Sequence, residues 1–142
     1  MYHHILIASD GSEASERAVR EGIQLAVDHK ARVTLLTASP PLHAIGGDAA
    51  QPDDAYRKAT GAVAEERLRP WADYARNHGL QAEMSHVFVA EPAEAIVRAA
   101  RARHCDLVVM GTRGYTGLKR ALLGSHAGDV IAMSEVPVLV CR

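Results

Sequence analysis

The sequence of 142 residues is poor in aromatic side chains and carries no excess of either charge. Aromatic residues make up 4% of it, and 16 Lys and Arg residues are balanced by 17 Asp and Glu residues. Proteins that hold single-stranded nucleic acid stack its bases on aromatic side chains and follow its backbone with positive charge. The composition therefore argues against nucleic acid as a partner, and against an anionic membrane surface.

Long apolar runs and a cysteine framework are also missing. No apolar run approaches the roughly 18 residues of a membrane span, and the opening residues MYHHIL lack the pattern of a signal peptide. The two cysteines, Cys105 and Cys141, form no C-x-x-C pair, so we expect two free thiols buried in strands. These absences predict a cytoplasmic protein without membrane attachment.

Motifs that define several enzyme and cofactor classes are absent as well. There is no G-x-x-x-x-G-K-S/T, which argues against a P-loop ATPase, and no G-x-G-x-x-G follows the first predicted strand. The eight histidines show no paired ligand spacing on one helix face, so we predict no metal site. No nucleophile elbow or two-carboxylate pair is recognisable, and we assign no catalytic residue.

The apolar residues that are present predict alternating strands and helices. We expect strands at residues 5–9, 33–38, 81–89, 107–110 and 136–141. We expect a first helix that buries Val19, Ile23 and Ala26, and further helices at about 54–78, from Pro92 onward and at about 125–133. Strands separated by helices favour right-handed crossovers, which build an open parallel sheet with helices on both faces. We therefore predict a single α/β domain over residues 1–142.

Three local features refine this prediction. Either Asp10 or Ser12 is expected to cap the first helix. Pro70 lies inside the pattern of the second helix, so we expect a kink there or a break into two helices. Residues 39–54 contain two prolines and two glycines in succession without periodicity, which predicts a long loop. The sequence leaves open whether that loop is a lid over a ligand or a solvated insertion.

The segment after the fourth predicted strand has the composition of an anion site. It is rich in glycine, contains basic residues such as Arg113 and no acidic residue, and leads into a helix. Glycines let backbone N–H groups approach a phosphate closely, and the N-terminus of a helix favours negative charge. The segment therefore predicts a phosphate cradle.

The spacing in this segment resembles the nucleotide-binding pattern of the universal stress protein family. The pattern is Gly111, two residues, Gly114, nine residues, then Gly124 and Ser125. Residues 5–12 (ILIASDGS), 91–96 (EPAEAI) and 136–140 (VPVLV) are similar to the family too. The resemblance implies a five-stranded Rossmann-like sheet, of the adenine nucleotide alpha hydrolase type, with strand order 3-2-1-4-5. It also implies ATP as ligand, with Mg²⁺ as a possible companion, and a homodimer through the C-terminal strand.

The resemblance also assigns roles to particular residues. The phosphates would be held by the backbone N–H groups of Gly111, Gly114, Gly124 and Ser125, with Arg113 offsetting their charge. The nucleoside would lie against the ends of the first and second strands, at Ala8, Ser9, Asp10 and Ala38. Met110, at the end of the fourth strand, is a further predicted site residue. His126 stands where the family more often has an aliphatic residue, which places an imidazole near the phosphates.

These observations predict a nucleotide-dependent regulatory protein of the stress response that binds ATP as a ligand. Two other hypotheses stay open. One is a slow ATP hydrolase or self-phosphorylating enzyme that uses Asp10 and His126. The other is an interaction module whose nucleotide site is structural or empty.

Overall fold

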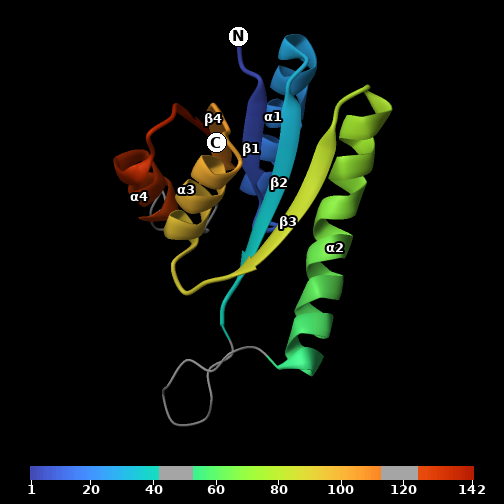
Figure 1. Ribbon diagram of the computed structural model, residues 1–142, viewed down its shortest axis with the longest axis vertical. Helices are drawn as coiled ribbons and strands as arrows, with labels where there is room; N and C mark the ends of the chain where they lie inside the picture. Colours follow the sequence, from blue (N-terminus) through green and yellow to red (C-terminus); the bar gives the residue numbers. More distant parts are fainter. Residues whose placement is uncertain (42–52, 113–124) are drawn as a thin grey trace.

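The fold is an open parallel sheet with helices on both faces, seen in a computed structural model that describes residues 1–41, 53–112 and 125–142 (Figure 1). The strands all run parallel in the order β3-β2-β1-β4-β5, which confirms the predicted sheet and its strand order. Along the chain the elements are β1 (His4–Ala8), α1 (Glu13–His29), β2 (Arg32–Ser39), α2 (Asp54–Asn77), β3 (Ala82–Phe88), α3 (Pro92–Ala102), β4 (Leu107–Gly111), α4 (Ser125–Met133) and β5 (Val138–Cys141).

The central strand β1 divides the core into two apolar clusters. Ile5 and Ile7 pack with residues of α1 and α2 on one face of the sheet, whereas Leu6 packs with residues of α3 and α4 on the other. All three side chains are fully buried, and burial of one such side chain contributes roughly 1.5–3 kcal/mol. A strand covered on both faces must be apolar at consecutive positions, which explains the continuous run at residues 5–7.

The helix ends follow the local sequence. Ser12 is the N-cap of α1, and its side-chain oxygen accepts a hydrogen bond from the backbone N–H of Ser15 at 3.2 Å. The alternative that Asp10 caps this helix is therefore wrong. Pro92 begins α3 as predicted, where its missing N–H costs no helical hydrogen bond. Gly79, at φ 81°, follows the end of α2 and turns the chain back toward β3.

Helix α2 runs without interruption through Pro70, so the predicted alternative of a break into two helices is wrong. Proline removes its own N–H, and the carbonyl group left without that partner belongs to Glu66. Glu66 and Pro70 are both exposed, so water can satisfy the carbonyl group on the outer side of the helix. The buried residues Ala64, Leu68, Ala72 and Ala75 hold the opposite side against the sheet. A bend at Pro70 stays a prediction.

The two cysteines are free thiols, as expected, but only one of them is buried. Cys105 lies two residues before β4, and burial raises the pKa of its thiol to about 11. Cys141 ends β5, which is an edge strand of the sheet formed by the described residues, and its side chain is half-buried. Leu139, in the same strand, keeps 40% of its surface exposed.

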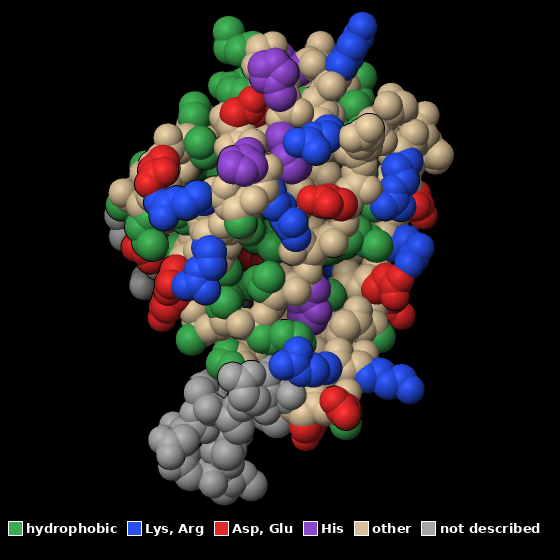
Figure 2. Space-filling view, in the orientation of Figure 1, with side chains coloured by type: hydrophobic (Ala, Val, Ile, Leu, Met, Phe, Trp, Pro, Cys, Tyr) green, Lys and Arg blue, Asp and Glu red, His purple; other side chains and the backbone are tan. Residues whose placement is uncertain are grey.

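Charges of both signs are interspersed on the face seen in Figure 2, where basic and acidic side chains alternate with apolar ones. This mixed surface agrees with the near balance of charges in the sequence. Within the described part of the chain, no helix is both long and apolar enough to cross a membrane.

Candidate functional site

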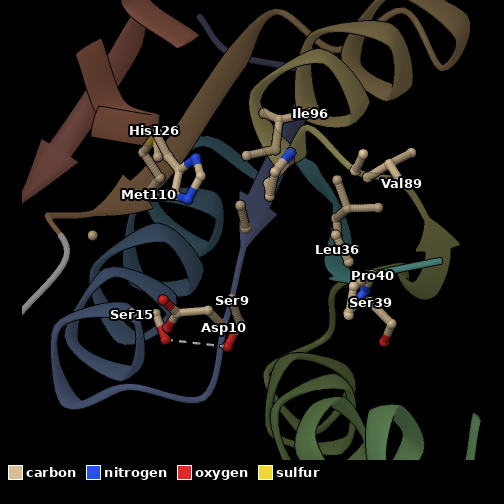
Figure 3. Close-up of a pocket in the computed structure, with 15 residues that line it drawn as sticks. Ser9, Asp10, Ser15, Leu36, Ser39, Pro40, Val89, Ile96, Met110 and His126 are labelled. Atoms are coloured by element: carbon tan, nitrogen blue, oxygen red, sulfur yellow. Dashed lines mark hydrogen bonds between the residues drawn. The ribbon is translucent and has the colours of Figure 1, made fainter. Parts of the chain in front are cut away.

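A cavity of about 470 Å³ opens at the carboxyl ends of the strands, between β1 and β4 (Figure 3). The chain leaves β1 toward β2 through α1, and β4 lies on the other side of β1. Ligands of open parallel sheets bind at such a reversal of strand order. The cavity is lined by Ala8, Ser9, Asp10, Ser15, Leu36, Ala38, Ser39, Pro40, Val89, Ala90, Pro92, Ile96, Met110, Gly111 and His126.

The turn after β1 fixes the polar floor of the cavity. Ser9 donates its backbone N–H to the carbonyl oxygen of Leu36 at 2.8 Å, in a bond to β2. Asp10 then turns the chain, since its Oδ1 accepts the backbone N–H of Ser12 at 2.9 Å. The hydroxyl groups of Ser9 and Ser15 lie 3.4 Å apart, and the Ser9 hydroxyl accepts the N–H of Gly11 at 3.3 Å. These contacts hold the end of β1 against the start of α1.

Most of the remaining wall is apolar. Leu36 and Ile96 come from β2 and α3, Met110 comes from β4, and Val89 directly follows β3. Among the described residues that line the cavity, Asp10 and His126 are the only ones with titratable side chains. Figure 3 shows them reaching the cavity from different elements, the turn after β1 and the first turn of α4. Such a cavity suits a ligand with an apolar part and a few polar groups.

Gly111 lets the end of β4 approach the start of α1 closely. A Cβ atom at this position would lie 2.6 Å from the carbonyl carbon and oxygen of Ala14 and 2.8 Å from the backbone nitrogen of Ser15. These are backbone atoms, which cannot move aside as a flexible side chain can. Gly111 therefore has a packing role, and its part in holding phosphates stays a prediction.

The universal stress protein family matches the chain over residues 1–142. The chain belongs to this family. A universal stress protein of Thermus aquaticus is 33% identical over 142 residues, with both chains covered in full. Universal stress protein MJ0531 of Methanocaldococcus jannaschii is 32% identical, over 100% of this chain and 83% of the relative. A solved universal stress protein in complex with cAMP is 28% identical, with a TM-score of 0.74 and coverage of 99% of this chain and 97% of that one.

The structure of this universal stress protein brings most of the predicted site residues together. The predicted residues that line the cavity are Ala8, Ser9, Asp10, Ala38, Met110, Gly111 and His126. Three others, Arg113, Gly114 and Gly124, lie outside the described residues, as do the side chain of Ser125 and residues 42–52 of the loop predicted at 39–54. Of the rest of that loop, residue 39 ends β2 and residue 54 begins α2. The backbone of Ser125 begins α4, as predicted.

Several lining residues were missed by the sequence analysis. Leu36 and Ile96 belong to apolar patterns that predict core packing, and no pattern marks the few core residues that border a cavity. Ser39 and Val89 lie at neighbouring ends of β2 and β3, where the N–H of Val89 donates to the carbonyl oxygen of Ser39 at 3.0 Å. The register of these two strands was needed to place them.

Proposed function

We propose that this protein binds an adenine nucleotide in the cavity at the ends of β1 and β4, and that the nucleotide acts as a regulatory ligand. The observation that carries the proposal is the cavity itself, which lies where the strand order reverses and is lined by seven of the residues predicted for a nucleotide. Its volume of about 470 Å³ falls in the usual range of small-molecule sites, roughly 300–1,000 Å³. The likeness to a solved universal stress protein in complex with cAMP supports the ligand class.

The nucleoside is proposed to occupy the apolar part of the cavity. Leu36, Ala38, Val89 and Ile96 offer aliphatic contacts to a flat base, and Ala38 leaves room because its side chain is small. Asp10 lies at the polar end, where its carboxylate can accept a hydrogen bond from a ribose hydroxyl.

The phosphates are proposed to lie toward β4 and α4, with ATP as the full ligand. Gly111, at the end of β4, begins the glycine pattern predicted to hold them. Helix α4 begins at Ser125, and the free N–H groups at the N-terminus of a helix favour the binding of anions. His126, in the first turn of α4, lines the same cavity. Arg113, Gly114 and Gly124 are proposed to complete the cradle.

A Mg²⁺ ion would depend mainly on the nucleotide itself. Within the described part of the chain, no group of three or more His, Cys, Asp and Glu side chains could hold a metal ion. Asp10 is the one carboxylate of the described lining, and magnesium commonly combines one or two carboxylates with substrate phosphates and water. Asp10 would thus contribute a single ligand to a metal held by the phosphates.

A regulatory role is proposed over an enzymatic one because of the composition of the lining. Phosphoryl transfer to water needs charge stabilisation and a positioned water molecule in addition to a bound triphosphate. The described lining offers only Asp10 and His126 as titratable side chains for these tasks. We further propose a cytoplasmic homodimer that pairs through β5 and couples nucleotide occupancy to a stress response.

Binding of ATP and cAMP should be measured by calorimetry for the parent protein and for Ala38→Leu. The larger side chain fills the proposed base site, so the affinity should fall by at least about tenfold, equivalent to roughly 1.4 kcal/mol. Ala62→Leu, at an exposed position of α2, is the matched control and should bind like the parent.

The nucleotide released when the purified protein is denatured identifies the ligand found in cells. ATP or another adenine nucleotide, released intact, supports the proposal. Steady conversion of ATP to ADP by the parent would instead make the protein an enzyme. Equal affinity of the parent and Ala38→Leu, or a parent that binds no adenine nucleotide, would remove the proposed site.

A further inference from the structure

Arg67, a half-buried residue of α2, reaches the ends of two strands from the face of the sheet opposite to the cavity. Its Nη1 donates a hydrogen bond to the Thr37 hydroxyl group at 2.8 Å. Thr37 is 1% exposed and belongs to β2. Its side chain lies on the same face of the sheet as that of Leu35, which packs in the cluster formed with α1 and α2. Ala38, the next residue, points the other way and lines the cavity.

The same guanidinium group lies close to Gly11 in the turn after β1. A Cβ atom on Gly11 would come within 2.8 Å of Nε of Arg67, and 3.2 Å of its Cζ, so only a glycine leaves room for this contact. Gly11 has a φ of 82°, which also favours glycine, and it directly follows Asp10 of the cavity lining. Arg67 therefore touches the immediate neighbours of two lining residues, one at the end of β1 and one at the end of β2.

A hydrogen bond between β3 and the end of β2 lies near the contacts that Arg67 makes with Thr37 and Gly11. His86 of β3 shares a hydrogen bond of 2.7 Å with the Ser39 hydroxyl group, and Ser39 also lines the cavity. Burial lowers the pKa of His86, and the nearby positive charge of Arg67 lowers it further. Two further charged side chains lie close to this part of β3: Arg57 lies over the neighbouring Phe88 ring, and Arg103 donates a hydrogen bond to the hydroxyl group of Ser85 at 3.1 Å. Burial and the charge of Arg67 both favour the neutral form of His86.

We propose that Arg67 is the positioning residue of the nucleotide site: its guanidinium group holds the Asp10–Gly11 turn and the end of β2 at a fixed separation. The inference rests on the proposed nucleotide binding. A planar guanidinium group can stack on a glycine and donate sideways to a hydroxyl group at once, which a lysine ammonium group cannot do in the same way. Arg67 does not itself line the cavity, so it acts through the residues it holds.

The test is a double-mutant cycle on nucleotide affinity, with cAMP and ATP as probes. Arg67→Gln removes the charged hydrogen bond, and Gly11→Ala displaces the guanidinium group. Each should weaken binding by about tenfold while circular dichroism stays that of the parent. Because both changes break one arrangement, the double variant should bind no more weakly than the weaker single variant. Arg69→Gln, which removes an exposed pair with Glu65 on the same helix, is the matched control and should bind like the parent.

NMR titration of His86 separates positioning from a general loss of stability. Arg67→Gln should raise the pKa of His86, and Arg67→Lys should keep it low while restoring only part of the affinity. Parent affinity in Arg67→Gln, or strictly additive effects in the cycle, would overturn the proposal. If the parent binds neither probe, the proposed function fails. The positioning role is then decided by how far the backbone amide chemical shifts of Asp10 and Ala38 in each variant differ from those of the parent. Larger shifts in Arg67→Gln than in Arg69→Gln support it, and equal shifts overturn it.

Discussion

Replacing Gly111 by alanine should destabilise the fold even when no ligand is bound. The added Cβ atom would lie 2.6 Å from two backbone atoms of Ala14 and 2.8 Å from the nitrogen of Ser15. Both residues belong to the first turn of α1 and are buried. Because the helix packs on β1 and β4, it cannot move away from Gly111 without loosening those contacts.

The size of the effect follows from the kind of atom that is met. Extra methylene groups forced into a packed core cost roughly 1–3 kcal/mol, and a clash with backbone lies near the upper end of this range. At roughly 4 °C per kcal/mol for a domain of this length, Tm should fall by about 10 °C. Gly61→Ala is the matched control because no atom lies within 4 Å of the new Cβ, and in helix α2 it should stabilise by about 0.5–1 kcal/mol.

Urea unfolding followed by circular dichroism, with nucleotide removed, gives the free energy of unfolding for both variants and the parent. Nucleotide affinity measured on the same samples then separates the two roles of Gly111. A Gly111→Ala variant as stable as the parent would refute the packing argument. If that stable variant also failed to bind nucleotide, the glycine would be required by the ligand alone.

Stability should also depend on pH, because burial and the Arg32 guanidinium group hold the pKa of His4 below its usual 6.5, and burial with Arg67 does the same for His86. Near and below pH 6.5 the unfolded chain binds more protons at these two histidines than the folded chain does. The free energy of unfolding should therefore decrease as the pH falls from 7 through 6.5 toward the folded pKa values. Equal urea midpoints at pH 7.5 and 5.5 would contradict this. Leu139→Lys, on the exposed edge strand β5, should convert the proposed dimer to a monomer by sedimentation velocity, whereas Val63→Lys, 54% exposed on α2, should not. Identical sedimentation of Leu139→Lys and the parent would exclude β5 as the interface.

Much of the fold could be predicted because its strongest signals are local. The continuous apolar run at residues 5–7 and the stripe at Val19, Ile23 and Ala26 identify a buried strand and a packed helix without knowledge of their partners. Pro92 marks a helix start through its own geometry. The prediction of a break at Pro70 was wrong because proline disrupts a helix to a degree that depends on its position. Here Glu66, whose carbonyl group loses its partner, is exposed, so water can bind that group.

The candidate site was predicted less completely because the residues that line a cavity come from several strands, helices and turns, whose arrangement in space a sequence pattern does not give. Ala8 and Met110 stand at strand ends, which a sequence pattern can mark, and the glycine spacing drew attention to Gly111. Arg67 lies in the middle of α2, where it matches an ordinary exposed position of a helix. Only the approach of α2 to the turn at Gly11 shows what its side chain holds.

The place of β1 in the sheet has a consequence for synthesis of the chain on the ribosome. This strand is made first, yet one of its edges pairs with β4, where Ile5 faces Leu107 roughly a hundred residues later. At a translation rate of about 5–20 residues per second, that edge waits roughly 5–20 s for its partner. During this interval β2 and the helices α1, α2 and α3 are available to cover the apolar run of β1, whereas β4 and α4 are not. An unpaired strand edge can pair with another chain, so a nascent copy is open to misassembly at β1 until β4 has emerged.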